Sequence, residues 1–191
     1  MRSVYFITHP NVVIDPAVAV PKWPLSRQGT ERMEALLAQP WVEGLSAIHC
    51  SMEQKAIDGA EILARHLSID CQVIEELGEI DRSSTGYLPR DEFQATVDAF
   101  FASPDRSIRG WESAREAQQR IVRAVETVMQ NDQSNGDIAI VSHGAVGALY
   151  LCHLKNRPIS RGEGQPGTDG GNFYSFDVQS RALQHGWVPI D

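Results

Sequence analysis

Two short apolar runs, far apart in the chain, each lead into a histidine. Residues 4–7 (Val-Tyr-Phe-Ile) are followed by Thr8-His9-Pro10, and residues 138–141 (Ile-Ala-Ile-Val) by Ser142-His143-Gly144. Such runs are typical of strands buried on both faces of a parallel sheet. Ligands bind at the carboxyl ends of strands in open α/β sheets. The pattern therefore predicts one site that holds both imidazoles.

Strand-like and helix-like segments alternate along the whole chain. Strands are predicted over residues 3–8, 45–50, 71–74, 138–142, 173–178 and 182–188. Helices are predicted over residues 27–39, 52–66, 91–102, 113–130 and 145–155. Ser26 and Ser51 are the predicted N-caps of the first two helices. The proline-rich segment 10–24 is predicted to lack regular structure, and the glycine-rich segment 160–171 to form a loop. This order predicts an α/β fold, a three-layer α/β/α sandwich whose mostly parallel sheet has an antiparallel edge.

Length and composition narrow the class of protein. With 191 residues and 42% hydrophobic residues, the chain is expected to form a single domain over residues 1–191. It has no apolar run of about 18 residues and no secretory signal, so a membrane protein is not expected. The net charge of -8, without a Lys/Arg cluster, disfavours nucleic-acid binding. The three scattered cysteines suggest free thiols in a reducing, cytoplasmic location.

A series of motifs resembles, in order, the histidine phosphatase superfamily, also called phosphoglycerate mutase-like. Thr8-His9-Pro10 stands where the family has Arg-His-Gly, and Ser142-His143-Gly144 is similar to its second histidine motif. The intervening similarities are Leu25-Ser26-Arg27-Gln28-Gly29 to Leu-Thr-x-x-Gly, Ser51 through Lys55-Ala56 to Ser-x-x-x-Arg-Ala, Leu77-Gly78-Glu79 to Leu-x-Glu, and Trp111-Glu112-Ser113 to Gly-Glu-Ser. Gly171-Asn172-Phe173 resembles the family's asparagine-containing turn before the last strands.

The resemblance implies a phosphatase that acts on a small phosphorylated molecule without metal or cofactor. His9 would attack phosphorus and carry a phosphohistidine, which divides one difficult transfer into two easier steps. His143 would stabilise the phosphoryl oxygens, and Glu79 would protonate the leaving group. The expected substrate-binding residues are Thr8, Ser51, Lys55, Ser142 and Asn172.

The sequence departs from the family pattern where positive charge is needed. Threonine replaces the first-motif arginine at Thr8, Pro10 replaces a glycine, and Lys55 keeps the second arginine's charge without its planar fork. Asp15 stands where the family usually has asparagine, and a carboxylate there would repel phosphate. Three arginines could supply the lost charge from another direction: Arg2, Arg82 or Arg90.

Several alternatives follow from these departures. A hydrolase is favoured over a mutase because the chain is short and lacks a long insertion. The main alternative is a catalytically impaired, phosphatase-like protein that binds an anion or a protein partner. A metal-dependent hydrolase using His9, His143 and a carboxylate has no closely spaced ligand pair to support it. The substrate's identity and the oligomeric state, a homodimer included, are left open by the sequence.

Overall fold

The computed structural model describes residues 2–191, which contain a six-stranded sheet in the order β3-β2-β4-β1-β5-β6. The strands are β1 (Ser3–Thr8), β2 (Leu45–Ser51), β3 (Cys71–Ile74), β4 (Asp137–Ser142), β5 (Asn172–Asp177) and β6 (Leu183–Pro189). Strands β1 to β4 pair in parallel, whereas β5 and β6 are antiparallel to their neighbours. This sheet confirms the predicted topology and its antiparallel edge.

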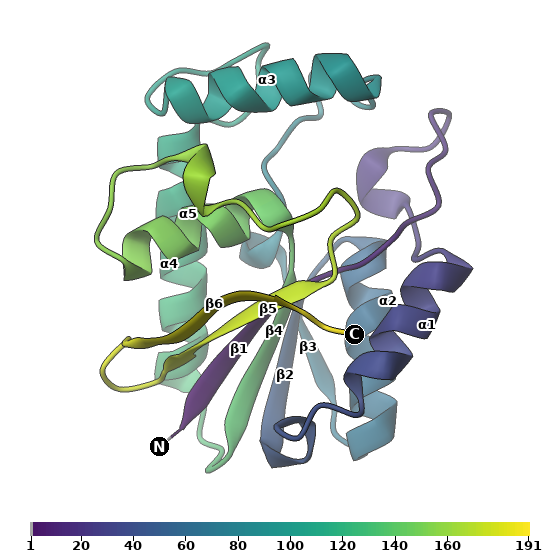
Figure 1. The fold of residues 1–191 in the computed structure, drawn as a ribbon, viewed down its shortest axis with the longest axis vertical. Coiled ribbons are helices and arrows are strands. Elements are labelled where there is room, and N and C mark those ends of the chain that lie inside the picture. The colour runs from purple at the N-terminus through teal and green to yellow at the C-terminus, as the bar shows by residue number, and fades with distance from the viewer. Residues whose placement is uncertain (1) are drawn as a thin grey trace.

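Helices cover both faces of the sheet (Figure 1). They are α1 (Arg27–Leu36), α2 (Gln54–Leu67), α3 (Arg90–Ala102), α4 (Ala114–Asn131) and α5 (Gly144–Leu154). Helices α1 and α2 lie on one face, α4 and α5 on the other, and α3 crosses beyond the carboxyl ends of the parallel strands. The three-layer α/β fold is therefore confirmed. None of the described helices is long and apolar enough to cross a membrane.

Successive residues of the central strands pack into different cores. On β1, Phe6 belongs to the cluster that includes α4 and α5, whereas Ile7 belongs to the cluster that includes α1 and α2. On β4, Ile140 and Val141 divide in the same way. Because side chains alternate between the faces of a strand, a sheet covered on both sides needs an unbroken apolar run. This double burial explains the two runs that lead into the histidines.

The structure corrects two local predictions. Segment 10–24 contains one turn of 3₁₀ helix at Val20–Lys22, begun by a proline near its N-terminus, where fixed φ is tolerated. Ser51 does not cap α2, because it is the last residue of β2; Glu53 occupies the N-cap position, with extended backbone. Ser26 does cap α1, accepting the N–H of Gly29.

Candidate functional site

The two strand-end histidines meet at one edge of the sheet. Thr8 pairs with Ser142 at the ends of β1 and β4, and the N–H of His9 donates to the Ser142 carbonyl at 3.2 Å. His9 and His143, which directly follow these two paired residues, therefore lie side by side where β1 and β4 end. The rings of His9 and His143 lie edge to face, with centroids 5.1 Å apart. The fold thus brings together the two imidazoles that the sequence placed at strand ends.

His9 is held as a neutral imidazole. Its Nδ1 lies 2.9 Å from the carbonyl oxygen of Pro10, which can only accept, so Nδ1 carries the proton. Burial, with the nearby positive charge of Lys55, lowers the pKa of His9 to about 4. Near neutral pH, Nε2 consequently presents an unprotonated lone pair, as nucleophilic attack requires.

His143 is fully buried and bound on one nitrogen only. Its Nε2 lies 2.7 Å from Ser51 Oγ, whereas its Nδ1 has no hydrogen-bond partner. Burial lowers the pKa of His143 to about 3. Ser51 Oγ already accepts the N–H of Glu53, so its own hydrogen can be donated to Nε2. In that arrangement Nδ1–H is an uncommitted donor inside the site.

Glu79 is fixed by backbone donors from the beginning of α5. Its carboxylate oxygens accept the N–H groups of Ala145 and Val146 at 3.1 Å and that of Ile80 at 3.0 Å. Burial, followed by the negative charge of Glu53, raises the pKa of Glu79 despite these donors. A raised pKa favours the protonated carboxyl that a general acid needs.

Sequence reasoning missed Glu53, whose carboxylate lies within the site. It contacts Lys55 Nζ at 2.5 Å and lies 3.6 Å from His143 Nε2, and it accepts the N–H of Glu79 at 3.0 Å. Burial opposes ionisation, but neighbouring His143 and Lys55 outweigh it and lower the pKa of Glu53 to about 2. Lys55 Nζ also donates to the carbonyl of Val20. The cation predicted to bind phosphate is therefore already paired with a carboxylate of the protein.

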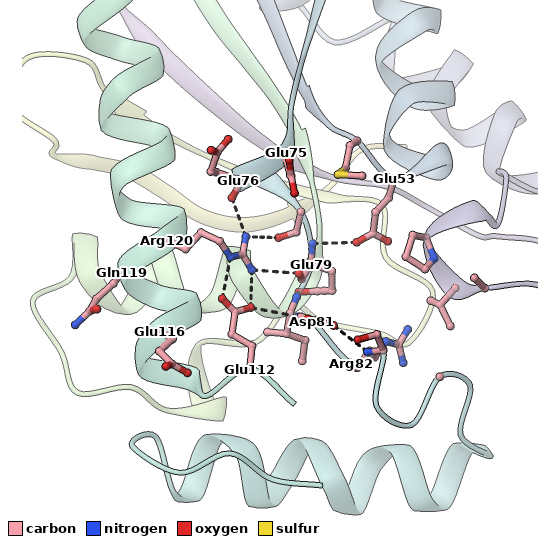
Figure 2. A pocket seen from close by; sticks show the side chains of 18 of the residues that line it. Glu53, Glu75, Glu76, Glu79, Asp81, Arg82, Glu112, Glu116, Gln119 and Arg120 are labelled. Atoms are coloured by element: carbon pink, nitrogen blue, oxygen red, sulfur yellow. Dashed lines mark hydrogen bonds and ion pairs between the residues drawn. The ribbon is translucent and has the colours of Figure 1, made fainter. Parts of the chain in front are cut away.

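Arg82 supplies positive charge beside this site. It lines the same cavity as Glu53 and Glu79 (Figure 2). Its guanidinium lies 4.8 Å from the centre of the Phe93 ring. Burial lowers the pKa of Arg82, and the carboxylates of Glu79 and Glu53 offset this effect only in part.

The other arginines considered from the sequence lie elsewhere. Arg2 forms an ion pair with Asp132 and bonds to Gly136, at the end of the sheet where the parallel strands begin. Arg90 is an exposed residue at the beginning of α3. Asp15, the carboxylate expected to repel phosphate, is also exposed and accepts the N–H of Ala17. The carboxylate that lies within the site is Glu53.

Three predicted substrate ligands are bonded to the protein itself. Thr8 Oγ1 lies 2.6 Å from Gln165 Oε1 and accepts the N–H of Asn172. The Asn172 amide donates to Gln165, Pro166 and Gly170. Ser142 Oγ donates to the carbonyl of Leu77 at 2.7 Å and so braces the segment that carries Glu79. These contacts fix the three side chains within the protein, and their direct contact with substrate stays a prediction.

A cavity of about 1000 Å³ opens beside Glu53, Glu79 and Arg82. Figure 2 shows that carboxylates line much of its wall. The further acidic lining residues are Glu75, Glu76, Asp81, Glu112 and Glu116. Arg120, on α4, bonds to the Glu112 carboxylate and to the carbonyl oxygens of Glu76, Gly78 and Glu79, so its charge is largely used to hold the Glu79 segment. Within residues 2–191, no group of three or more His, Cys, Asp or Glu side chains is arranged to hold a metal ion.

The chain matches the profile of a protein family. The profile of the histidine phosphatase superfamily (branch 1) matches residues 18–181, which is most of the chain and begins after His9. A comparison with curated proteins gave no match.

Solved structures match the fold over nearly its full length. Mycobacterial glucosyl-3-phosphoglycerate phosphatase in complex with inorganic phosphate has a TM-score of 0.81 and 16% identity, with 100% of this chain and 99% of that chain covered. YhfR from Bacillus stearothermophilus has a TM-score of 0.77 and 20% identity, with coverage of 97% and 95%. Entamoeba histolytica phosphoserine phosphatase in complex with 3-phosphoglyceric acid has a TM-score of 0.75 and 18% identity, with coverage of 97% and 96%. At these identities the likeness concerns the fold.

Proposed function

Because the chain belongs to the histidine phosphatase superfamily, we propose that it hydrolyses phosphate monoesters through a phosphohistidine on His9. The observation that carries this proposal is the neutral His9, whose Nδ1–H bonds to the Pro10 carbonyl, which leaves Nε2 as the unprotonated nitrogen of a ring that lies beside His143. A neutral imidazole fixed in one tautomer is prepared for attack on phosphorus.

The reaction divides into two balanced steps. His9 Nε2 forms a bond to phosphorus as the ester P–O bond breaks, and protonated Glu79 gives its proton to the departing alkoxide. Water then attacks the phosphohistidine, Glu79 takes a proton from that water, and the P–N bond breaks to release orthophosphate. The raised pKa of Glu79 suits both the donation and the return of this proton.

Charge on the transferring phosphoryl group must be met by donors in the site. Arg82 and the free Nδ1–H of His143 fit this task. Lys55 contributes less than a free lysine would, because Glu53 is in direct contact with its ammonium group. We expect turnover that is slow for this fold, since loss of one stabilising donor typically costs about 10²–10³ in rate.

The substrate class in this proposal is a small phosphorylated molecule. Two of the structural neighbours are complexes with inorganic phosphate and with 3-phosphoglyceric acid, which supports that class. Hydrolysis is preferred to mutase activity because two of the structural neighbours described above are phosphatases. A cytoplasmic location belongs to the same proposal and is supported by the free thiols of Cys50, Cys71 and Cys152.

A second candidate function is favoured by Glu53. A carboxylate 2.5 Å from the Lys55 ammonium neutralises the positive charge that would otherwise attract phosphate. This arrangement would also suit a catalytically impaired protein that binds an anion or a protein partner. The two candidates differ in whether His9 ever becomes phosphorylated.

Hydrolysis of aryl phosphates at several pH values tests the proposal. We expect His9→Ala to abolish turnover and His153→Ala, which changes an exposed histidine on α5, to retain it. Rapid acid-free quenching with a ³²P-labelled ester should show an acid-labile phosphoprotein in the wild type and not in His9→Ala. Equal rates for the wild type and His9→Ala would refute catalysis by His9 and favour the second candidate.

A further inference from the structure

Two of the three cysteines, separate in the sequence, lie together in the structure. The Sγ atoms of Cys50 on β2 and Cys71 on β3 are 3.2 Å apart. Ile48 pairs with Cys71 in the parallel ladder, and Cys50 follows Ile48 by two residues, so Cys50 and Cys71 project from the same face. Both pack in the cluster formed with α1 and α2.

The environments of the two thiols differ. Cys50 is fully buried, whereas Cys71, at the first position of the edge strand β3, is partly exposed. The hydrogen bond between the two sulfurs lowers the pKa of the Cys71 thiol, and the same contact together with burial raises the pKa of Cys50. A small oxidant would therefore meet Cys71 first, and Cys50 is the nearest sulfur to any product formed there.

We propose that Cys50 and Cys71 form a reversible disulfide when the protein meets a peroxide. The Cys71 thiolate attacks the outer oxygen of a hydroperoxide, the O–O bond breaks, and the released alkoxide or hydroxide takes a proton. The Cys50 sulfur then attacks the resulting sulfenic acid, and water leaves with the Cys50 proton. Two thiols are oxidised by two electrons, and the hydroperoxide is reduced to an alcohol or water and a second water.

The local structure suits this bond. A disulfide has an S–S distance of about 2.0 Å, so the sulfurs must approach by about 1 Å. Strand β3 is only four residues long and lies at the edge of the sheet, where a small shift disturbs one neighbour only. The bond would join β2 to β3 one residue before Ser51, whose Oγ contacts His143. This proposal uses no step of the phosphate chemistry and does not depend on it.

Thiol counting on the folded protein tests the proposal. The protein is treated with hydrogen peroxide, unfolded in an alkylating reagent, and examined by mass spectrometry and peptide mapping. We expect alkylatable thiols to fall from three to one, with Cys152 retained and the peptides of Cys50 and Cys71 linked. Dithiothreitol should restore all three.

Single variants separate this outcome from general oxidation. Cys152→Ser removes the buried thiol of α5 and should still lose two thiols and give the linked peptide. Cys71→Ser and Cys50→Ala, each checked for native circular dichroism, should give no linked peptide. Oxidation of Cys71 to sulfinic or sulfonic acid without linkage to Cys50 would overturn the proposal. A Cys71 disulfide between two chains, seen on a non-reducing gel, would overturn it too.

Discussion

Replacing Glu53 by glutamine should strengthen anion binding at the histidine site. Lys55 and the N–H of Glu79 contact different oxygens of the Glu53 carboxylate, so the single oxygen of glutamine can keep only one of these contacts. The change removes the negative charge and keeps the size of the side chain. An anion hydrogen-bonded to His143 would lie about 6 Å from residue 53, where two unit charges interact with about 3 kcal/mol at an effective dielectric of about 20. Partial compensation by Lys55 reduces this to about 1–2 kcal/mol, or about 5- to 30-fold in affinity.

The same substitution should make the free protein less stable. Glutamine leaves the buried ammonium of Lys55 without its counter-charge, and loss of a charged hydrogen bond costs about 1–3 kcal/mol. A bound anion would restore the counter-charge. Saturating phosphate should therefore raise the melting temperature of Glu53→Gln more than that of the wild type.

Calorimetric titration with orthovanadate and orthophosphate measures this effect directly. Glu75→Gln is the matched control, because Glu75 lines the same cavity but is exposed to solvent, where screening weakens its influence. We expect a clear gain for Glu53→Gln and less than a twofold change for Glu75→Gln. Equal or weaker anion binding by Glu53→Gln, with its fold intact, would show that Glu53 does not limit the site.

Three further outcomes follow from the site. Glu79→Gln should slow hydrolysis of phenyl phosphate by about 10²–10⁴ and that of an ester with a strongly acidic phenol much less, since the latter needs no proton; equal losses would argue against Glu79 as the acid. The free energy of unfolding measured in urea should fall as pH drops from 6.5 toward 4. Burial lowers the pKa of His9 and His143 in the folded protein, so the unfolded chain binds more protons over this range. The fall should be smaller in His143→Asn. Ser142→Ala should cost about 1–3 kcal/mol of unfolding free energy, because it leaves the buried carbonyl of Leu77 without a donor; an unchanged urea midpoint would contradict this.

The positions of both histidines could be predicted because they depend on local pattern and sheet topology. Each follows an apolar run that is buried on two faces, and parallel strands deliver their carboxyl ends to one edge. Glu79 was predictable by its place after Leu77, but the reason for its raised pKa was not. That reason is burial among the first N–H groups of α5 and beside Glu53.

Glu53 was missed because the beginning of α2 was predicted two residues early. With Ser51 as the cap, Glu53 would lie on the first helical turn, where a carboxylate is usually solvated. With β2 continuing to Ser51, Glu53 becomes the extended residue before the helix and its side chain reaches Lys55 and His143. The sequence did contain a signal for Glu53, because it lies between Ser51 and Lys55, which were both expected to bind substrate.

The roles of Thr8 and Asn172 depended on contacts that no local pattern shows. Their common partner Gln165 comes from the glycine-rich loop, far along the chain from Thr8. Gly170 in that loop has a positive φ and lies so close to the His9 carbonyl that a Cβ there would stand 2.1 Å from the oxygen. Long-range packing of a loop against a strand end therefore decided where the Thr8 hydroxyl is directed.

The fold and the charge of this site are set by different parts of the chain. Strands β1 and β4 position the histidines through their ladder, which belongs to a fold that a sequence only 16% identical shares. The cations and carboxylates come from the beginning of α2, with Glu53 at the N-cap and Lys55 in the first turn, and from the segment that carries Arg82. One substitution there changes the charge and leaves the strands of the sheet unchanged. We therefore expect the charge at position 53, more than the similarity of fold, to decide how tightly this site binds an anion.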